Sequence, residues 1–154
     1  MELSSAFWWF ILIGLGAQLV DGALGMAFGL VSSSVMLAMG IPPAQASAAI
    51  HTAEVFTTGA SGVSHLVAGN VDKRLFLRLA LPGAVGGAVG AYGLTQLPGE
   101  VIRPLIYLYL LVLAIIILAR AAGRLMPKGE VKRVPVLGFV AGFLDASGGG
   151  GWGP

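Results

Sequence analysis

The sequence has few charged residues for its length. Its 154 residues include 9 Lys or Arg and 7 Asp or Glu, so that only 10% of the chain is charged. A soluble domain usually carries about 25% charged residues, because water must solvate its surface. Hydrophobic residues, in contrast, make up 56%. This balance excludes a soluble enzyme, a nucleic-acid binder and a disordered tail, and it predicts a protein that lies in the lipid bilayer.

Cysteine is absent, which excludes disulfides, zinc sites with Cys ligands, thiol catalysis and iron–sulfur clusters. A basic segment ahead of the first apolar run is also missing, because the chain starts Met-Glu-Leu-Ser-Ser. Cleaved signal peptides carry such a segment. We therefore expect the first apolar stretch to remain in the mature protein.

Apolar runs of membrane-spanning length follow one another along the chain. A crossing helix needs about 20 apolar residues, and the first run, residues 6–40, is too long for one straight crossing. Its one charge, Asp21, is followed by Gly22 and Gly25, which predict a break. We interpret this run as one broken crossing, and the alternative is a hairpin of two short halves. Further spans are expected at 44–68, 78–100 and 104–119, with a fifth apolar segment from 134.

These runs predict an all-α, polytopic helical membrane protein with about four spans in residues 1–133. Basic residues gather at 73–78 and 120–133, and two spans separate the two groups. The positive-inside rule then makes the loops 70–78 and 120–133 cytoplasmic. We expect a multi-pass protein of a bacterial inner membrane, in contact with lipid and not with nucleic acid.

The third span carries a pattern of closely spaced glycines. Gly83 with Gly87 and Gly86 with Gly90 form two overlapping small-xxx-small faces. Such faces let helix backbones approach closely in membranes. We expect another helix to pack tightly here, although a glycine-rich helix facing lipid would show the same pattern.

Two segments of the chain resemble each other at a constant offset of 124 residues. Asp21 then matches Asp145, Gly25 matches Gly149, and three further identities fall within the same 16 positions. Paired glycine-interrupted apolar segments are typical of the two halves of a transporter. Residues 1–133 are thus interpreted as a first half-repeat and 134–154 as the truncated start of a second. We expect the missing C-terminal half, or a second copy, to be needed for a complete path.

Polar side chains form one stripe on the second span. They are spaced by three and four residues, which places them on one helical face. A Glu at membrane depth costs at least ~2–3 kcal/mol unless it faces a partner or water, so the stripe predicts the lining of a path. A hydrogen-bonded cluster that only holds helices together is the alternative. The stripe consists of Ser47, His51, Glu54, Thr58, Ser61 and His65.

Asp21 and Asp145 each lie beside glycines, where a broken helix exposes backbone N–H groups. Either Asp carries a proton during transport, or it caps the following half-helix. The glycines around Gly149 offer bare amides to a substrate. His51 and Glu54, at i and i+3, can share or pass a proton.

A metal site is not expected from the second span. Glu54 and His65 are 11 residues apart, which is about 16 Å along a helix, so that one ion cannot reach both. Neither the His-Glu-x-x-His nor the Gly-x-Ser-x-Gly pattern of hydrolases occurs. We expect no metal, no cofactor and no enzyme activity.

Several short motifs together resemble the TauE/SafE family. The resemblance implies a fully helical permease with two related halves and about eight spans, associated with the export of sulfite and related small sulfur-containing anions. The motifs are Gln18-Leu-Val-Asp-Gly-Ala-Leu-Gly-Met26, Gly40-Ile-Pro-Pro43, His51-Thr-Ala-Glu-Val-Phe-Thr-Thr-Gly59, Ser64-His65, Gly69-Asn-Val-Asp72 and the glycine-rich stretch 145–154.

Our hypothesis is a proton-coupled secondary carrier for a small anion, either sulfite or a related sulfur-containing or organic anion. A non-transporting accessory subunit and an anion channel are the alternatives. The residues expected to bind substrate or couple protons are Asp21, Gly22, Gly25, His51, Glu54, Thr58, Asp145 and Gly149.

Overall fold

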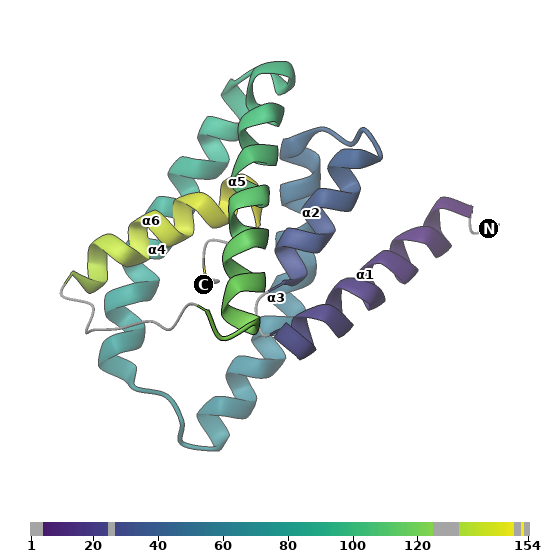
Figure 1. Cartoon of the computed structure of the whole chain (residues 1–154). Coiled ribbons are helices and arrows are strands. Elements are labelled where there is room, and N and C mark those ends of the chain that lie inside the picture. The colour runs from purple at the N-terminus through teal and green to yellow at the C-terminus, as the bar shows by residue number, and fades with distance from the viewer. Residues whose placement is uncertain (1–4, 25–26, 125–132, 150–151, 153–154) are drawn as a thin grey trace.

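A computed structural model describes residues 5–24, 27–124, 133–149 and 152. These residues form helices and connecting turns with no strand, which confirms the all-α prediction (Figure 1). The helices are α1 (Ser5–Leu24), α2 (Phe28–Ala38), α3 (Pro43–Val67), α4 (Lys73–Gln96), α5 (Gly99–Ala121) and α6 (Val134–Gly148).

Local sequence signals account for most of the helix ends. Gly40 and Gly69 follow α2 and α3 with φ values of 84° and 72°, a left-handed conformation that glycine adopts without steric cost. Asp72 caps α4, because its Oδ1 accepts the N–H groups of Arg74 and Leu75 at 2.9 and 3.0 Å. Proline at the first position of α3 suits a helix start, where no N–H donor is needed.

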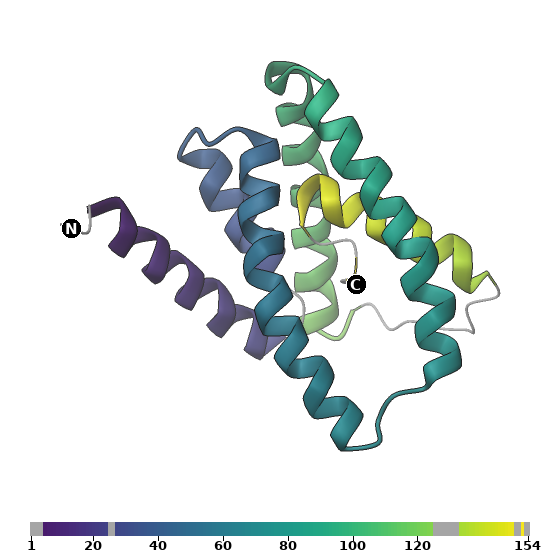
Figure 2. The same cartoon turned by 180° about the vertical axis from the view of Figure 1, so that it is seen from behind.

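The first apolar run is broken between α1 and α2, as predicted. Helix α1 runs toward the lower end of the bundle and α2 runs back up beside α3, so that the chain reverses direction in both views (Figures 1 and 2). This reversal favours the hairpin alternative over one broken crossing, and the number of times that the run crosses the membrane stays a prediction. Hydropathy reports the length of an apolar run and the place of a break, but not the angle between the two halves.

Helix α6 lies across α4, and glycine makes this close crossing possible (Figure 2). A Cβ atom added to Gly138 would lie 2.7 Å from the carbonyl oxygen of Leu79, and one added to Gly90 would lie 2.6 Å from that of Phe143. Gly83 and Gly86 likewise face α6 or Trp152 too closely for a side chain. The predicted tight partner of the third span is therefore α6, which lies in the predicted second half-repeat.

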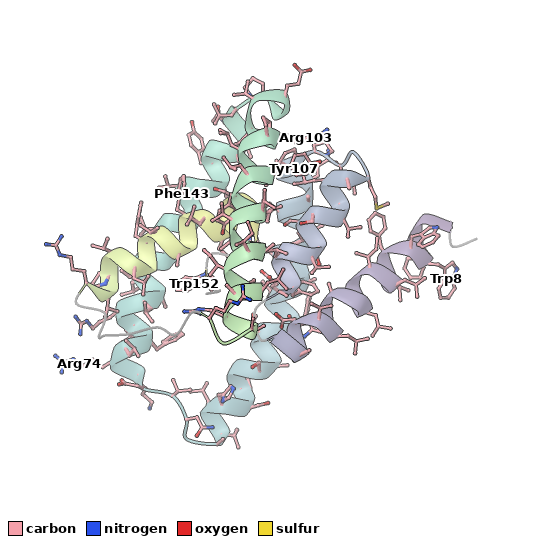
Figure 3. The ribbon with its side chains drawn as sticks, viewed as in Figure 1. Trp8, Arg74, Arg103, Tyr107, Phe143 and Trp152 are labelled. Atoms are coloured by element: carbon pink, nitrogen blue, oxygen red, sulfur yellow. The ribbon has the colours of Figure 1, made fainter. Side chains whose placement is uncertain are left out.

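The buried core is small and lies where α2 packs against α3 and α5, with Leu94 added from α4. One cluster contains Leu37, Leu94, Ile106 and Leu110, and a second contains Met36, Ala46 and Ile50. Most other large apolar side chains are exposed, including those of the α1 segment that carries Trp8 (Figure 3). One face of α5 belongs to this core, because Ile106, Leu110 and Ile117 are buried.

Two helices of the described part, α4 and α5, are long and apolar enough to cross a membrane by length and composition. The described apolar parts of α1, α2 and α6 are shorter, and the 25-residue α3 carries the polar stripe. The number of about four spans in residues 1–133 stays a prediction. The basic start of α4, marked by Arg74, and the end of α5 lie at one end of the bundle, opposite Arg103 (Figures 1 and 3).

Candidate functional site

The polar stripe of α3 is covered by other helices over its N-terminal half only. Ser47 is buried, and His51 and Glu54 are half-buried. His51 Nδ1 lies 2.8 Å from Glu54 Oε2, so that the contact expected from the i,i+3 spacing is present. Thr58, Ser61 and His65 are exposed, and the Thr58 hydroxyl donates to the carbonyl of Glu54 on its own helix. The structure therefore brings His51 and Glu54 to the interior but leaves Thr58 outside it.

Asp145 of α6 completes this pair to a cluster of three titratable groups. One ligand-type atom from each of His51, Glu54 and Asp145 lies within 4.8 Å of the others. Next to Asp145, the hydroxyl of Ser47 donates to the carbonyl of Ala146 at 2.6 Å. This buried hydrogen bond joins α3 to α6 one residue away from Asp145. We call His51, Glu54 and Asp145 the triad.

A cavity of about 410 Å³ lies beside the triad, between α3, α4 and α6. His51 and Asp145 supply its titratable groups. Most of the remaining lining is small, because the glycines and alanines of α4 face it. Trp152 adds an aromatic wall and lies close to Gly83 (Figure 3). The full lining consists of His51, Gly83, Ala84, Gly87, Ala88, Ala91, Gly142, Asp145, Ala146 and Trp152.

The two glycine breaks meet next to this site. A Cβ on Gly29 would lie 2.7 Å from the carbonyl carbon of Gly149, so that the start of α2 touches the end of α6. Gly149 has a φ of 68°, and its N–H donates to the carbonyl of Asp145 at 2.6 Å. Gly149 thus lies at the site as expected. Gly22 is exposed with open space around it, and Gly25 lies outside the described residues.

Asp21 acts as a cap in the structure. Its Oδ1 accepts the N–H groups of Ala27 and Phe28 at 2.6 and 3.1 Å, at the start of α2. These donors have no partner inside the helix, and the negative charge also suits the positive end of the helix dipole. The capping alternative is therefore observed. A role of Asp21 in carrying protons stays a prediction.

Sequence reasoning missed two aromatic residues at the site. Tyr109 of α5 packs its ring close to Gly148, and its hydroxyl is buried without a hydrogen-bond partner among the described residues. Trp152 lines the cavity. Both are aromatic residues in apolar or glycine-rich surroundings, and no spacing pattern marks them. A buried hydroxyl without a partner is costly, so Tyr109 is a candidate to donate to water or substrate.

The triad can hold and exchange protons, and it also contains the donor atoms of a metal site. His51 and Glu54 share a hydrogen bond at 2.8 Å, and a second carboxylate lies within reach. The expectation that no metal would bind considered only α3, where His65 is too distant. It did not include a ligand from α6, because 91 residues separate Glu54 from Asp145.

Comparison with known proteins supports a transport function. A Bacillus subtilis (strain 168) protein named probable membrane transporter protein YtnM is 53% identical over 152 residues, which cover 94% of this chain and 51% of that protein. A Sinorhizobium sp protein, probable membrane transporter protein ORF9, is 30% identical over 99 residues, or 64% of this chain and 38% of that protein. The chain thus spans about half the length, or less, of these curated relatives. No solved structure is significantly similar to it.

The family comparison covers nearly the whole chain and includes the triad and both glycine breaks. The sequence model described as Sulfite exporter TauE/SafE matches residues 10–154. Membrane transport is what this family and the named relatives have in common. The chain belongs to the TauE/SafE family of membrane transporters.

Proposed function

We propose that the protein carries a small anion, sulfite or a related sulfur-containing or organic anion, across the cell membrane as a proton-coupled secondary carrier. The observation that carries this proposal is the triad beside the cavity, in which His51, Glu54 and Asp145 lie within 4.8 Å of one another. The description of the family as sulfite exporters supports the choice of anion.

Charge repulsion links the proton to the anion in this mechanism. Two ionised carboxylates about 5 Å apart repel each other by roughly 3 kcal/mol at an effective dielectric constant of 20, and an entering anion adds to this repulsion. A proton held by the triad removes one negative charge. Because the same proton favours anion binding, linkage requires that the anion also favour protonation. Protonation and anion loading then occur together.

The cavity suits a small ligand. Its volume of about 410 Å³ falls near the lower end of ligand pockets, which span about 300–1,000 Å³. Small side chains on α4 and α6 leave this space open, and the polar groups lie at one side. A compact oxyanion or a short organic anion can therefore enter without displacing a helix.

Flux into proteoliposomes tests the role of Glu54. We expect Glu54→Gln to slow uptake of sulfite at least tenfold and to remove its response to an imposed proton gradient, because Gln cannot exchange a proton. Glu100→Gln is the matched control, since Glu100 is exposed in the first turn of α5. An unchanged rate and gradient response in Glu54→Gln would refute the proposed coupling.

The same assay separates the alternative functions. A channel would give flux that rises linearly with anion concentration and ignores the proton gradient. An accessory subunit would give no flux with either variant or with the unmodified protein. A saturable, gradient-driven flux is expected for the carrier.

We infer that further spans complete the translocation path, either from the remainder of a longer chain or from a second copy. The chain spans 51% of the Bacillus subtilis relative. Thr58, Ser61 and His65 are also exposed on α3, and polar groups at membrane depth normally face protein or water. Light scattering on the active, detergent-solubilised protein tests this inference. A transporting monomer of 15.7 kDa would contradict it.

A further inference from the structure

We propose that His51, Glu54 and Asp145 form a binding site for one divalent transition-metal cation of the zinc class. The three residues supply one imidazole nitrogen and two carboxylate oxygens, all within 4.8 Å of one another. They come from α3 and α6, two helices that the predicted repeat assigns to different half-repeats. Cation binding goes beyond the proposed transport of an anion and does not depend on it.

The distances are close to those that a bound zinc ion requires. Zn²⁺ binds His nitrogen and carboxylate oxygen at about 2.0–2.2 Å, which places tetrahedral ligand atoms about 3.4 Å apart. His51 Nδ1 and Glu54 Oε2 lie 2.8 Å apart and would separate by about 0.6 Å around an ion, whereas the widest separation among the three ligand atoms is at most 4.8 Å. Closing that gap takes a movement of about 1.4 Å or less. A movement of this size is within the reach of a carboxylate rotation, because the two oxygens of one carboxylate are themselves farther apart than this.

The types of ligand atom select the class of cation. Mg²⁺ and Ca²⁺ prefer oxygen ligands alone, whereas soft cations such as Cu⁺ prefer sulfur, which this cysteine-free chain supplies only through methionine. One imidazole with two carboxylates is a mixed nitrogen and oxygen set, which suits Zn²⁺ and Co²⁺. Two carboxylates also balance the two positive charges of the ion, so that the occupied site carries no net charge in apolar surroundings.

The surrounding packing holds the ligands in place. The hydrogen bond from Ser47 to the carbonyl of Ala146 joins α3 to α6 one residue away from Asp145. The close contact of Gly90 with Phe143 and Ser147 fixes the same turn of α6 against α4. A prearranged ligand set costs little to order when the ion binds. Three protein ligands leave a fourth position for water, as in zinc sites that remain open.

Metal binding to the purified protein, prepared without a polyhistidine tag, tests the proposal. Titration with ZnCl₂ in a calorimeter should give one ion per chain. His51→Gln, Glu54→Gln and Asp145→Asn should each weaken binding at least tenfold, because even loss of an outer partner of a metal ligand costs about 10–100-fold. His65→Gln is the matched control on the same helix, since its side chain is exposed, and it should bind as the unmodified protein does.

A second measurement uses only the unmodified protein, so that its result does not depend on whether the variants fold. CoCl₂ added to the unmodified protein should produce the strong visible absorption of four-coordinate Co²⁺, and ZnCl₂ should displace it. Failure of the unmodified protein to bind Zn²⁺ saturably would overturn the proposal, as would equal affinity in the three triad variants or equally tight binding of Mg²⁺. None of these results depends on anion flux, so that failure of the metal site and failure of the transport function are separately visible.

Discussion

Replacing Gly90 by alanine should separate α4 from α6 and displace the triad, whereas the same change at Gly93 should not. A Cβ on Gly90 would lie 2.6 Å from the carbonyl oxygen of Phe143, but a Cβ on Gly93 would meet nothing within 4 Å. Ordinary contact begins at 3.4 Å. The helices must therefore move apart by about 0.8 Å in Gly90→Ala, since backbone on both sides cannot rotate away.

The expected free-energy difference follows from two contributions. Alanine in place of glycine favours a helix by about 0.8–1.0 kcal/mol at either position, so that this contribution cancels when the two variants are compared. Overpacking costs about 1–3 kcal/mol and applies to Gly90 alone. Gly90→Ala should therefore be less stable than Gly93→Ala by about 1–3 kcal/mol.

Thermal unfolding in detergent and proteoliposome flux measure the two consequences. The contact of Gly90 involves Phe143 and Ser147, which lie on either side of Asp145. A shift of α6 therefore moves Asp145 relative to His51, and flux should fall in Gly90→Ala and persist in Gly93→Ala. If Gly90→Ala were as stable and as active as Gly93→Ala, the close crossing of α4 and α6 would not be the structure of the protein in lipid.

Three further predictions concern the cap of α2, the contact between α3 and α6, and the orientation of the protein in the membrane. Asp21→Ala should lower the free energy of unfolding by about 0.5–2 kcal/mol, because two N–H groups at the start of α2 lose their acceptor. Asp21→Asn should recover much of this lost stability, and thermal unfolding in detergent measures both variants. Ser47→Ala removes the hydrogen bond to the carbonyl of Ala146 and should lower the free energy of unfolding by about 0.5–1.5 kcal/mol. It should also reduce flux, and full flux would contradict a role of Ser47 in positioning Asp145. Because the chain lacks cysteine, single Asn70→Cys and Ala122→Cys variants can be labelled in intact cells, and a membrane-impermeant maleimide should spare both if both loops are cytoplasmic.

Features of the site that depend on neighbours in sequence could be predicted. The contact of His51 with Glu54 follows from their spacing on one helix, and the close packing of α4 follows from its repeated glycines. The identity of the packing partner could not be predicted in the same way. Gly90 meets Phe143 across 53 residues of chain, and no local pattern encodes which helix fills a given groove.

The extent of the polar stripe was also beyond sequence reasoning. Periodicity assigns Ser47, Glu54 and His65 to one face, but it does not tell how far along the helix that face is covered. In the structure, the cover ends after Glu54, because α6 crosses α3 only near its N-terminal half. The direction of the chain after the break near Asp21 was missed for a related reason, since hydropathy carries no information on angles.

The predicted repeat relates the position of the triad to the two breaks in the chain. At the offset of 124 residues, the last residue of α1, Leu24, corresponds to Gly148, the last residue of α6. The two helices thus end at equivalent positions, and each carries its Asp three residues before that end. The structure then brings the break after α6 against the first turn of α2, where Gly29 and Gly149 touch. With residues 1–133 and 134–154 as separate half-repeats, which the offset predicts, neither half supplies all of the titratable groups of the triad. Alternating access by motion of one half against the other would therefore change the distance between Glu54 and Asp145, and with it the affinity of the triad for protons.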